Sequence, residues 1–190
     1  MQQSLQAEES KAPGMQGFAE AVARYYYKLL AYKDEYEVAR LYSEADFRQQ
    51  LERQFEGDYQ IKFHMAPPMI GKKDSVTGLP IKTTFGPWME RMLPLLAKFK
   101  FLRGTPLDPF GRSDDRRMER KLIHQYEQIV NEIIAGLTTD NHRLAIELAR
   151  YPEFIRGYGH IKRQHVDEIQ PKVDDLLHAW RQPETTPQAA

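Results

Sequence analysis

Glycine and proline are concentrated in one stretch of this 190-residue chain, since residues 57–111 contain six of its eleven glycines and seven of its twelve prolines. Both residue types interrupt regular structure, glycine through its conformational freedom and proline through its fixed φ and missing N–H donor. Patterns typical of helices precede and follow this stretch. The sequence therefore predicts loops, turns and short strands held on a helical frame.

The flanking segments carry apolar residues at spacings of three and four, which place them on one helical face. One pattern runs from Phe18 through Leu41, the strongest runs from Met118 to Leu137, and a last one runs from Ile161 to Trp180. Residues 59–65 instead alternate in polarity, which predicts a strand. We expect a mainly α (α+β) fold of about six helices, with a small antiparallel β element near residues 59–84.

The chain length favours one domain. We predict a single helical domain over residues 15–181, with a Gly/Pro-rich insert over residues 57–112. Residues 1–14 are polar and lack periodicity, which predicts a flexible leader, and residues 182–190 predict a disordered tail.

The composition excludes several classes of function. The sequence has no cysteine, which removes disulfides, thiolate-ligated clusters and cysteine nucleophiles. Its 27 basic and 27 acidic residues cancel, which gives no support to nucleic-acid or anionic-membrane binding. No apolar run approaches the length of a membrane span, and the first residues do not resemble a signal peptide. A cytoplasmic protein is expected.

Basic residues near the insert raise the question of an anion site. Lys72, Arg103 and Arg112, joined by the more distant His160, are candidates for binding a cofactor phosphate or an acidic partner. The alternative, which we favour, is that these cations pair with nearby acids and anchor the loops, because charges that are close in sequence are weak evidence for a site. The acids available in the same stretch are Asp108, Asp114 and Asp115.

No pattern nominates a catalytic or metal-binding residue. The histidines lack the spacing of a helical metal site, and no nucleophile motif is present. We therefore expect each histidine to have a structural role with a local hydrogen bond. Trp88 follows a turn and could be a stacking platform, but we expect it to fill the core beneath a loop.

Several strings do resemble a known family. FEGDYQIKFHMAPP, TGLPIKTTFGPWM, LRGTPLDPFG, RRMERKLIHQYE and YPEFIRGYGHIK are similar, in this order, to the carboxy-terminal region of bacterial indolepyruvate:ferredoxin oxidoreductases, which belong to the 2-oxoacid:acceptor oxidoreductases. The similarity covers about residues 17–180. The resemblance implies a parent enzyme that converts arylpyruvates to aryl-acetyl-CoA with thiamine diphosphate, iron–sulfur clusters, CoA and ferredoxin.

The resemblance supplies no catalytic residue for this stretch of sequence. It implies an accessory, interaction-type domain or subunit that contacts the catalytic domains of the parent enzyme, binds no cofactor itself and is inactive alone. A homo-oligomer is a further option. The alternative is an anion-binding domain that contributes Lys72, Arg103, Arg112 and His160 to the CoA or arylpyruvate site.

Overall fold

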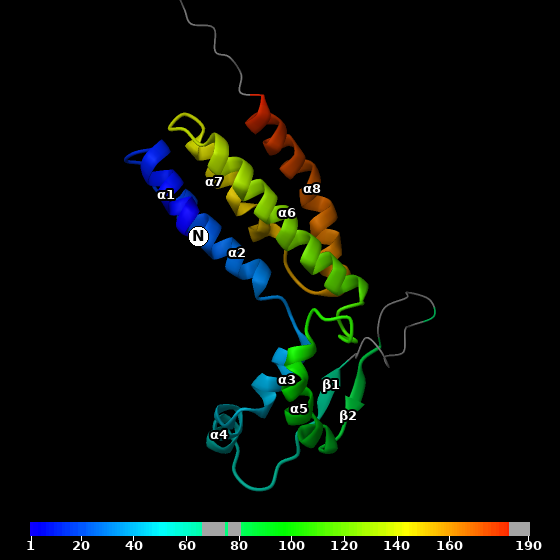
Figure 1. Cartoon of the computed structure of the whole chain (residues 1–190). Coiled ribbons are helices and arrows are strands. Elements are labelled where there is room, and N and C mark those ends of the chain that lie inside the picture. Colours follow the sequence, from blue (N-terminus) through cyan, green and yellow to red (C-terminus); the bar gives the residue numbers. More distant parts are fainter. Residues whose placement is uncertain (66–74, 76–80, 183–190) are drawn as a thin grey trace, which may run out of the picture. The chain divides into compact units, whose positions relative to one another are not determined.

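A computed structural model describes residues 1–65, 75 and 81–182. Within these residues the chain forms eight α-helices, two short 3₁₀ helices and one two-stranded antiparallel sheet, which confirms a mainly α fold with a small β element (Figure 1). In chain order the elements are α1 (Gln2–Lys11), α2 (Phe18–Leu30), α3 (Glu35–Ser43), α4 (Ala45–Gln54), β1 (Phe63–Met65), β2 (Thr83–Phe85), α5 (Trp88–Lys98), η1 (Phe99–Leu102), α6 (Asp114–Gly136), α7 (His142–Arg150), η2 (Tyr151–Phe154) and α8 (Gly159–Arg181).

The chain divides into two compact units, where the sequence predicted one domain over residues 15–181. Residues 1–32 and 118–190 form the first, here called the bundle unit, and residues 33–117 form the second, the insert unit. The predicted helix from Phe18 through Leu41 is interrupted at this boundary, since α2 ends at Leu30 and α3 begins at Glu35. Asp34 begins α3 by accepting a hydrogen bond from the Glu37 backbone N–H at 2.9 Å.

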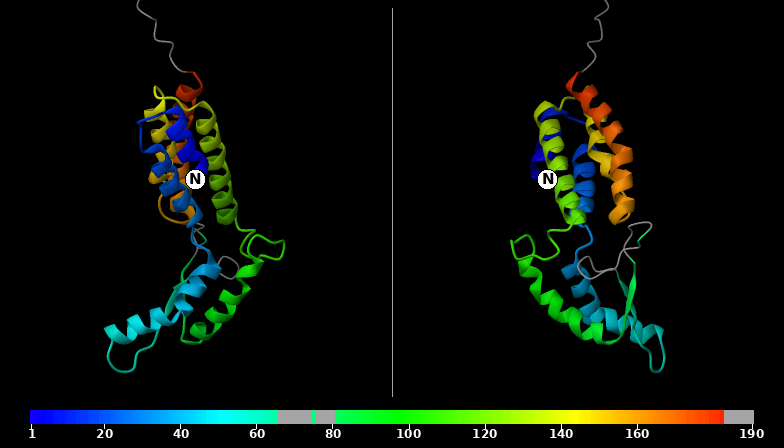
Figure 2. Two further views of the ribbon diagram at one scale, coloured as in Figure 1. Left: turned by 60° about the vertical axis from the view of Figure 1, so that its left-hand side comes forward. Right: turned by 90° about the vertical axis from the view of Figure 1, so that its right-hand side faces the viewer.

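The bundle unit is built around the apolar stripes that the sequence predicted, and its helices run side by side (Figures 1 and 2). The buried Phe18 and Leu29 of α2 belong to the same core as Leu122 and Ile133 of α6. Fully burying one such side chain contributes about 2 kcal/mol. The buried hydroxyl of Tyr126 donates to the Ala149 carbonyl at 2.8 Å, so the largest core side chain of α6 leaves no polar atom unsatisfied.

Helix α1 corrects the prediction of a flexible leader over residues 1–14. Its Glu8 side chain is buried and accepts hydrogen bonds from the backbone N–H groups of Phe18, at 2.7 Å, and Ala19, at 3.0 Å. Its Lys11 ammonium donates to the carbonyl oxygens of Ile134 and Ala135 at the end of α6. The Glu8 carboxylate therefore bonds the free N–H groups at the start of α2, and the Lys11 ammonium bonds the free carbonyl groups at the end of α6. Both contacts are stabilising, and apolar periodicity does not reveal them.

The insert unit has a small core of its own. Phe63 of β1 and Leu93 of α5 are buried together with Ala39 of α3, and α3 packs against α5. Strand β1 pairs with β2 in the register Phe63–Phe85, His64–Thr84 and Met65–Thr83. This register confirms the antiparallel element expected near residues 59–84. Residues 183–190 of the predicted tail lie outside the described residues.

Two prolines lie inside helices. They are Pro94 in α5 and Pro171 in α8, and both helices continue through them. Among the described helices, none has the length and apolar character needed to cross a membrane.

Candidate functional site

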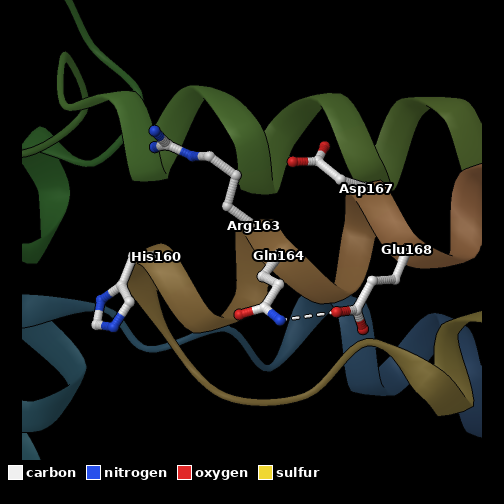
Figure 3. Close-up of a pocket in the computed structure, with 5 residues that line it drawn as sticks. All are labelled: His160, Arg163, Gln164, Asp167 and Glu168. Carbon is white, nitrogen blue, oxygen red and sulfur yellow. Dashed lines mark hydrogen bonds between the residues drawn. The ribbon is translucent and has the colours of Figure 1, made fainter.

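His160 belongs to the bundle unit and lines a shallow hollow of about 470 Å³ on α8 (Figure 3). The other lining residues are Arg163, Gln164, Asp167 and Glu168. All five come from one face of a single helix, and Gln164 donates to Glu168 at 2.7 Å. The two carboxylates outnumber the one guanidinium, so this surface does not favour an anion.

Arg103 and Arg112 belong to the insert unit. Arg103 binds both carboxylate oxygens of Asp34, with Nε at 2.9 Å and Nη2 at 3.0 Å. Arg112 donates to the Pro106 carbonyl at 2.8 Å. Both guanidiniums therefore hold loop 103–112 in place. Lys72 lies outside the described residues.

Arg103 forms an ion pair as expected, whereas Arg112 donates to a backbone carbonyl, and most of the acids involved are not the predicted ones. Arg103 pairs with Asp34, and Arg116 pairs with Glu35 at 2.7 Å, so both acids come from the segment before the insert. Of the acids predicted to pair, Asp114 lies 3.8 Å from Arg117. The acids that bind Arg103 and Arg116 lie far away in the sequence, so they became evident only with the fold.

Asp108 instead organises the loop through backbone groups. Its buried carboxylate accepts from the Gly104 N–H at 3.0 Å and from the Phe110 N–H at 3.1 Å. The Tyr36 hydroxyl donates to it at 3.2 Å. Burial alone would raise the pKa of Asp108, but these donors together bring it below the ordinary value. Gly111 is needed here, because a Cβ at this position would lie 2.7 Å from an Asp108 oxygen.

An apolar surface lies on the outer side of α5. Trp88, Met92, Leu95 and Phe99 follow one another at helical spacing and are 41–56% exposed, and we call these four side chains the α5 face. The expectation that Trp88 fills the core is wrong, since its ring is 56% exposed and packs edge-on against Phe85. The opposite side of α5, with the buried Leu93, already covers the core of the insert unit.

The histidines described here have structural hydrogen bonds, as expected, although the partner of His142 is distant in sequence. His64 shares a 2.9 Å hydrogen bond with Thr84 across the β1–β2 pair, and His165 Nδ1 lies 2.9 Å from the Arg156 carbonyl. His142 is buried and contacts Glu8 at 2.7 Å. Across the described ranges, no three His, Asp or Glu side chains gather as a metal-ligand set.

Sequence reasoning missed two buried polar pairs in the bundle unit. Lys162 of α8 contacts Glu119 of α6 at 2.5 Å, with both side chains more than 90% buried. Glu8 and His142 form the other pair, across 134 positions of sequence. The partners in each pair are far apart in the chain, and no local motif signals them.

Comparison with known proteins gives one match. A family model described as a family of unknown function, DUF6537, matches residues 1–175. That range includes the whole insert unit and all of the bundle unit except the end of α8 and the residues after it. No curated protein and no solved structure matches the sequence.

Proposed function

Since this chain belongs to DUF6537, a family of unknown function, we propose its role from its surface and from the strings that resemble a known enzyme. It is an accessory interaction domain of an indolepyruvate (2-oxoacid):ferredoxin oxidoreductase and does not catalyse alone. Its partners are the catalytic domains or subunits of that enzyme, in which thiamine diphosphate and iron–sulfur clusters reside. A cytoplasmic location is part of the proposal, and a sequence without cysteine is compatible with that reducing compartment.

The observation that carries the proposal is the α5 face. Its four large apolar side chains follow one another along α5 and the first residue of η1 and are exposed, although α5 contributes Leu93 to a core on its other side. Clustered apolar exposure of this kind is typical of interaction surfaces, whereas isolated exposed apolar residues are ordinary. Trp and Met are also enriched at the centres of protein interfaces.

The alternative role, an anion-binding domain for the CoA or arylpyruvate site, receives less support. Arg103 and Arg112 already have partners within their own unit. His160 belongs to the other unit and has two carboxylates beside it. An anion would therefore have to compete with bonds that hold the loop together, at a cost in stability.

The docking role predicts that the α5 face determines affinity for the rest of the enzyme. The double variant Trp88→Ala/Leu95→Ala is expected to weaken binding by roughly a hundredfold or more, because each truncated interface anchor costs about 2 kcal/mol and about 1.4 kcal/mol corresponds to tenfold. Binding of the purified chain to the remaining enzyme polypeptide is measured by calorimetry. Tyr27→Ala serves as the matched control, since Tyr27 is 73% exposed on the bundle unit. Equal affinity of the double variant and the wild type would remove the α5 face from the proposal.

The accessory role also predicts that the chain is inactive by itself. Indolepyruvate, thiamine diphosphate, CoA and ferredoxin are supplied, and no reduction of ferredoxin is expected above background. The physical reason is that the sequence offers no cysteine to hold an iron–sulfur cluster for electron transfer. Measurable turnover by the purified chain would show that the domain catalyses and is not merely accessory.

A further inference from the structure

We propose that the groove between α6 and α8 of the bundle unit is a binding site for a small, uncharged, apolar molecule that carries one hydrogen-bonding oxygen. This proposal is independent of the role of the α5 face, because it concerns a different unit and a different class of ligand.

The groove exists because α6 and α8, which run side by side in Figure 1, are tied together at two separated places. Near the start of α8, Lys162 contacts Glu119. Near its end, Arg181 binds both carboxylate oxygens of Glu132 at 2.7 Å. The Trp180 ring lies beside Gly136, where a Cβ would be only 3.4 Å from it. Between these ties the helices leave a groove of about 250 Å³.

The size and lining of the groove define its ligand. Its apolar surface comes from α6, from α8, and from η2 and the residue after it, and includes Leu122, Ile129, Ile155, Val166, Ile169 and Leu177. The volume is below the usual range for drug-sized ligands. At about 30 Å³ for each water-sized group, it holds roughly eight non-hydrogen atoms. An apolar molecule of that size would gain from leaving water at this surface.

Tyr151 supplies the polar contact. The residue is only 6% exposed, and it lines the groove. Among the described residues its hydroxyl has no hydrogen-bond partner, yet its oxygen is not completely shielded from solvent. Water can therefore reach the hydroxyl, and a ligand oxygen that enters the groove would replace that water as its hydrogen-bond partner. The neighbouring Tyr126 hydroxyl differs, because it already donates to the Ala149 carbonyl.

The charges around the groove select an uncharged ligand. Arg181 is the cation that lines it, and Glu132 already neutralises Arg181 through two hydrogen bonds. Asp174 accepts from Gln170 at 2.8 Å and adds a negative charge at the edge. A carboxylate ligand would therefore meet net negative potential and lose its hydration without compensation.

The test uses 1-octanol, which matches the groove in size, with octanoate as its charged counterpart. Binding to the full chain is followed through the methyl resonances of residues in the groove, such as Ile129, Ile155 and Ile169. We expect saturable shifts there with 1-octanol, weaker binding of octanoate, and unmoved methyl resonances of Ile61 in the insert unit. Tyr151→Phe, which removes only the hydroxyl, is expected to weaken 1-octanol binding about fivefold, the usual effect of one hydrogen bond. Tyr27→Phe, at an exposed tyrosine, is the matched control and is expected to change nothing.

A second variant tests the site by filling it. Val166→Phe places a larger side chain in the groove and is expected to abolish the methyl shifts, with circular dichroism confirming that the helices remain. Three results would overturn the proposal. They are the absence of saturable shifts in the wild type, equal 1-octanol affinity of wild type and Tyr151→Phe, and concentration-dependent shifts of the same methyl groups without ligand. The last result would instead assign the groove to a second copy of the chain.

Discussion

Replacing Lys162 by methionine is expected to lower the free energy of unfolding of the bundle unit by about 3–5 kcal/mol. The methionine keeps most of the volume of the lysine stem but removes the ammonium that contacts Glu119 at 2.5 Å. The Glu119 side chain is only 6% exposed, so its carboxylate would remain buried without that partner. An uncompensated buried charge is among the most destabilising changes that one substitution produces.

A double-mutant cycle distinguishes the interaction between Lys162 and Glu119 from the contacts that each residue makes with its other neighbours. Lys162→Met/Glu119→Leu removes both charges, and its stability is expected to return to within about 2 kcal/mol of the wild type. Urea unfolding is followed by the fluorescence of Trp180 in a Trp88→Phe background, so that the signal reports the bundle unit. Arg24→Met is the control, because the Arg24–Glu20 pair is 67% and 73% exposed and contributes little. A single variant as stable as the control, or a double variant as unstable as the single, would contradict the explanation.

Replacing Glu8 by glutamine is expected to destabilise the bundle unit by about 2–3 kcal/mol. The glutamine has nearly the same shape, but its amide nitrogen replaces one of the two accepting oxygens. This nitrogen is a donor and would face a group that also donates. The Glu8 carboxylate accepts from two backbone N–H groups at the start of α2 and contacts His142. Glu9→Gln, on the next and exposed residue, is the control and is expected to have little effect.

The loss of stability caused by Glu8→Gln should also depend on pH, and its direction can be derived. Burial alone would raise the pKa of Glu8, but the backbone donors of Ala19 and Phe18 and the contact with His142 lower it overall. A carboxyl group with a lowered pKa in the folded state stabilises that state above its unfolded value of about 4.5. This stabilisation is lost as the pH falls below that value and through the folded pKa. The difference in Tm between wild type and Glu8→Gln should therefore shrink between pH 5 and lower pH, and a constant difference would refute this origin.

The helices that could be predicted were those with local signals at both ends. Serine favours the position before a helix, and the Ser113 Oγ accepts from the Arg116 N–H at 3.3 Å at the start of α6. Glycine favours helix ends, and the same helix ends at Gly136. Capping and apolar periodicity act over a few residues, so the sequence displays both.

The break between α2 and α3 could not be predicted, because the apolar residues before and after it follow one periodic pattern although they are buried in two different units. Tyr25 is buried in the bundle unit, whereas Tyr36, eleven positions later on the same stripe, is buried in the insert unit beside Asp108. Burial, together with the nearby Asp108 carboxylate, raises the pKa of Tyr36 to about 12. Periodicity indicates which residues are buried, but it does not indicate in which core they are buried.

The candidate site was the least predictable part because its contacts join distant segments. The Arg103–Asp34 pair spans 69 positions and the Lys162–Glu119 pair spans 43. The prediction that Trp88 fills the core was wrong for another reason. Tryptophan tends to be buried both in cores and in interfaces, so this tendency does not distinguish the two. The exposed ring became informative only when Met92, Leu95 and Phe99 were found on the same face.

The loop that closes around Asp108 has a consequence for how a partner would meet it. A mobile loop must be ordered when it binds, at about 1–2 kcal/mol for each residue whose backbone becomes fixed. Here folding has already fixed the backbone, through the N–H groups of Gly104 and Phe110 that converge on one carboxylate. Leu107, which is 77% exposed between them, is therefore presented in a set position before any encounter. A surface preorganised in this way discriminates by rigid shape and loses little entropy on association.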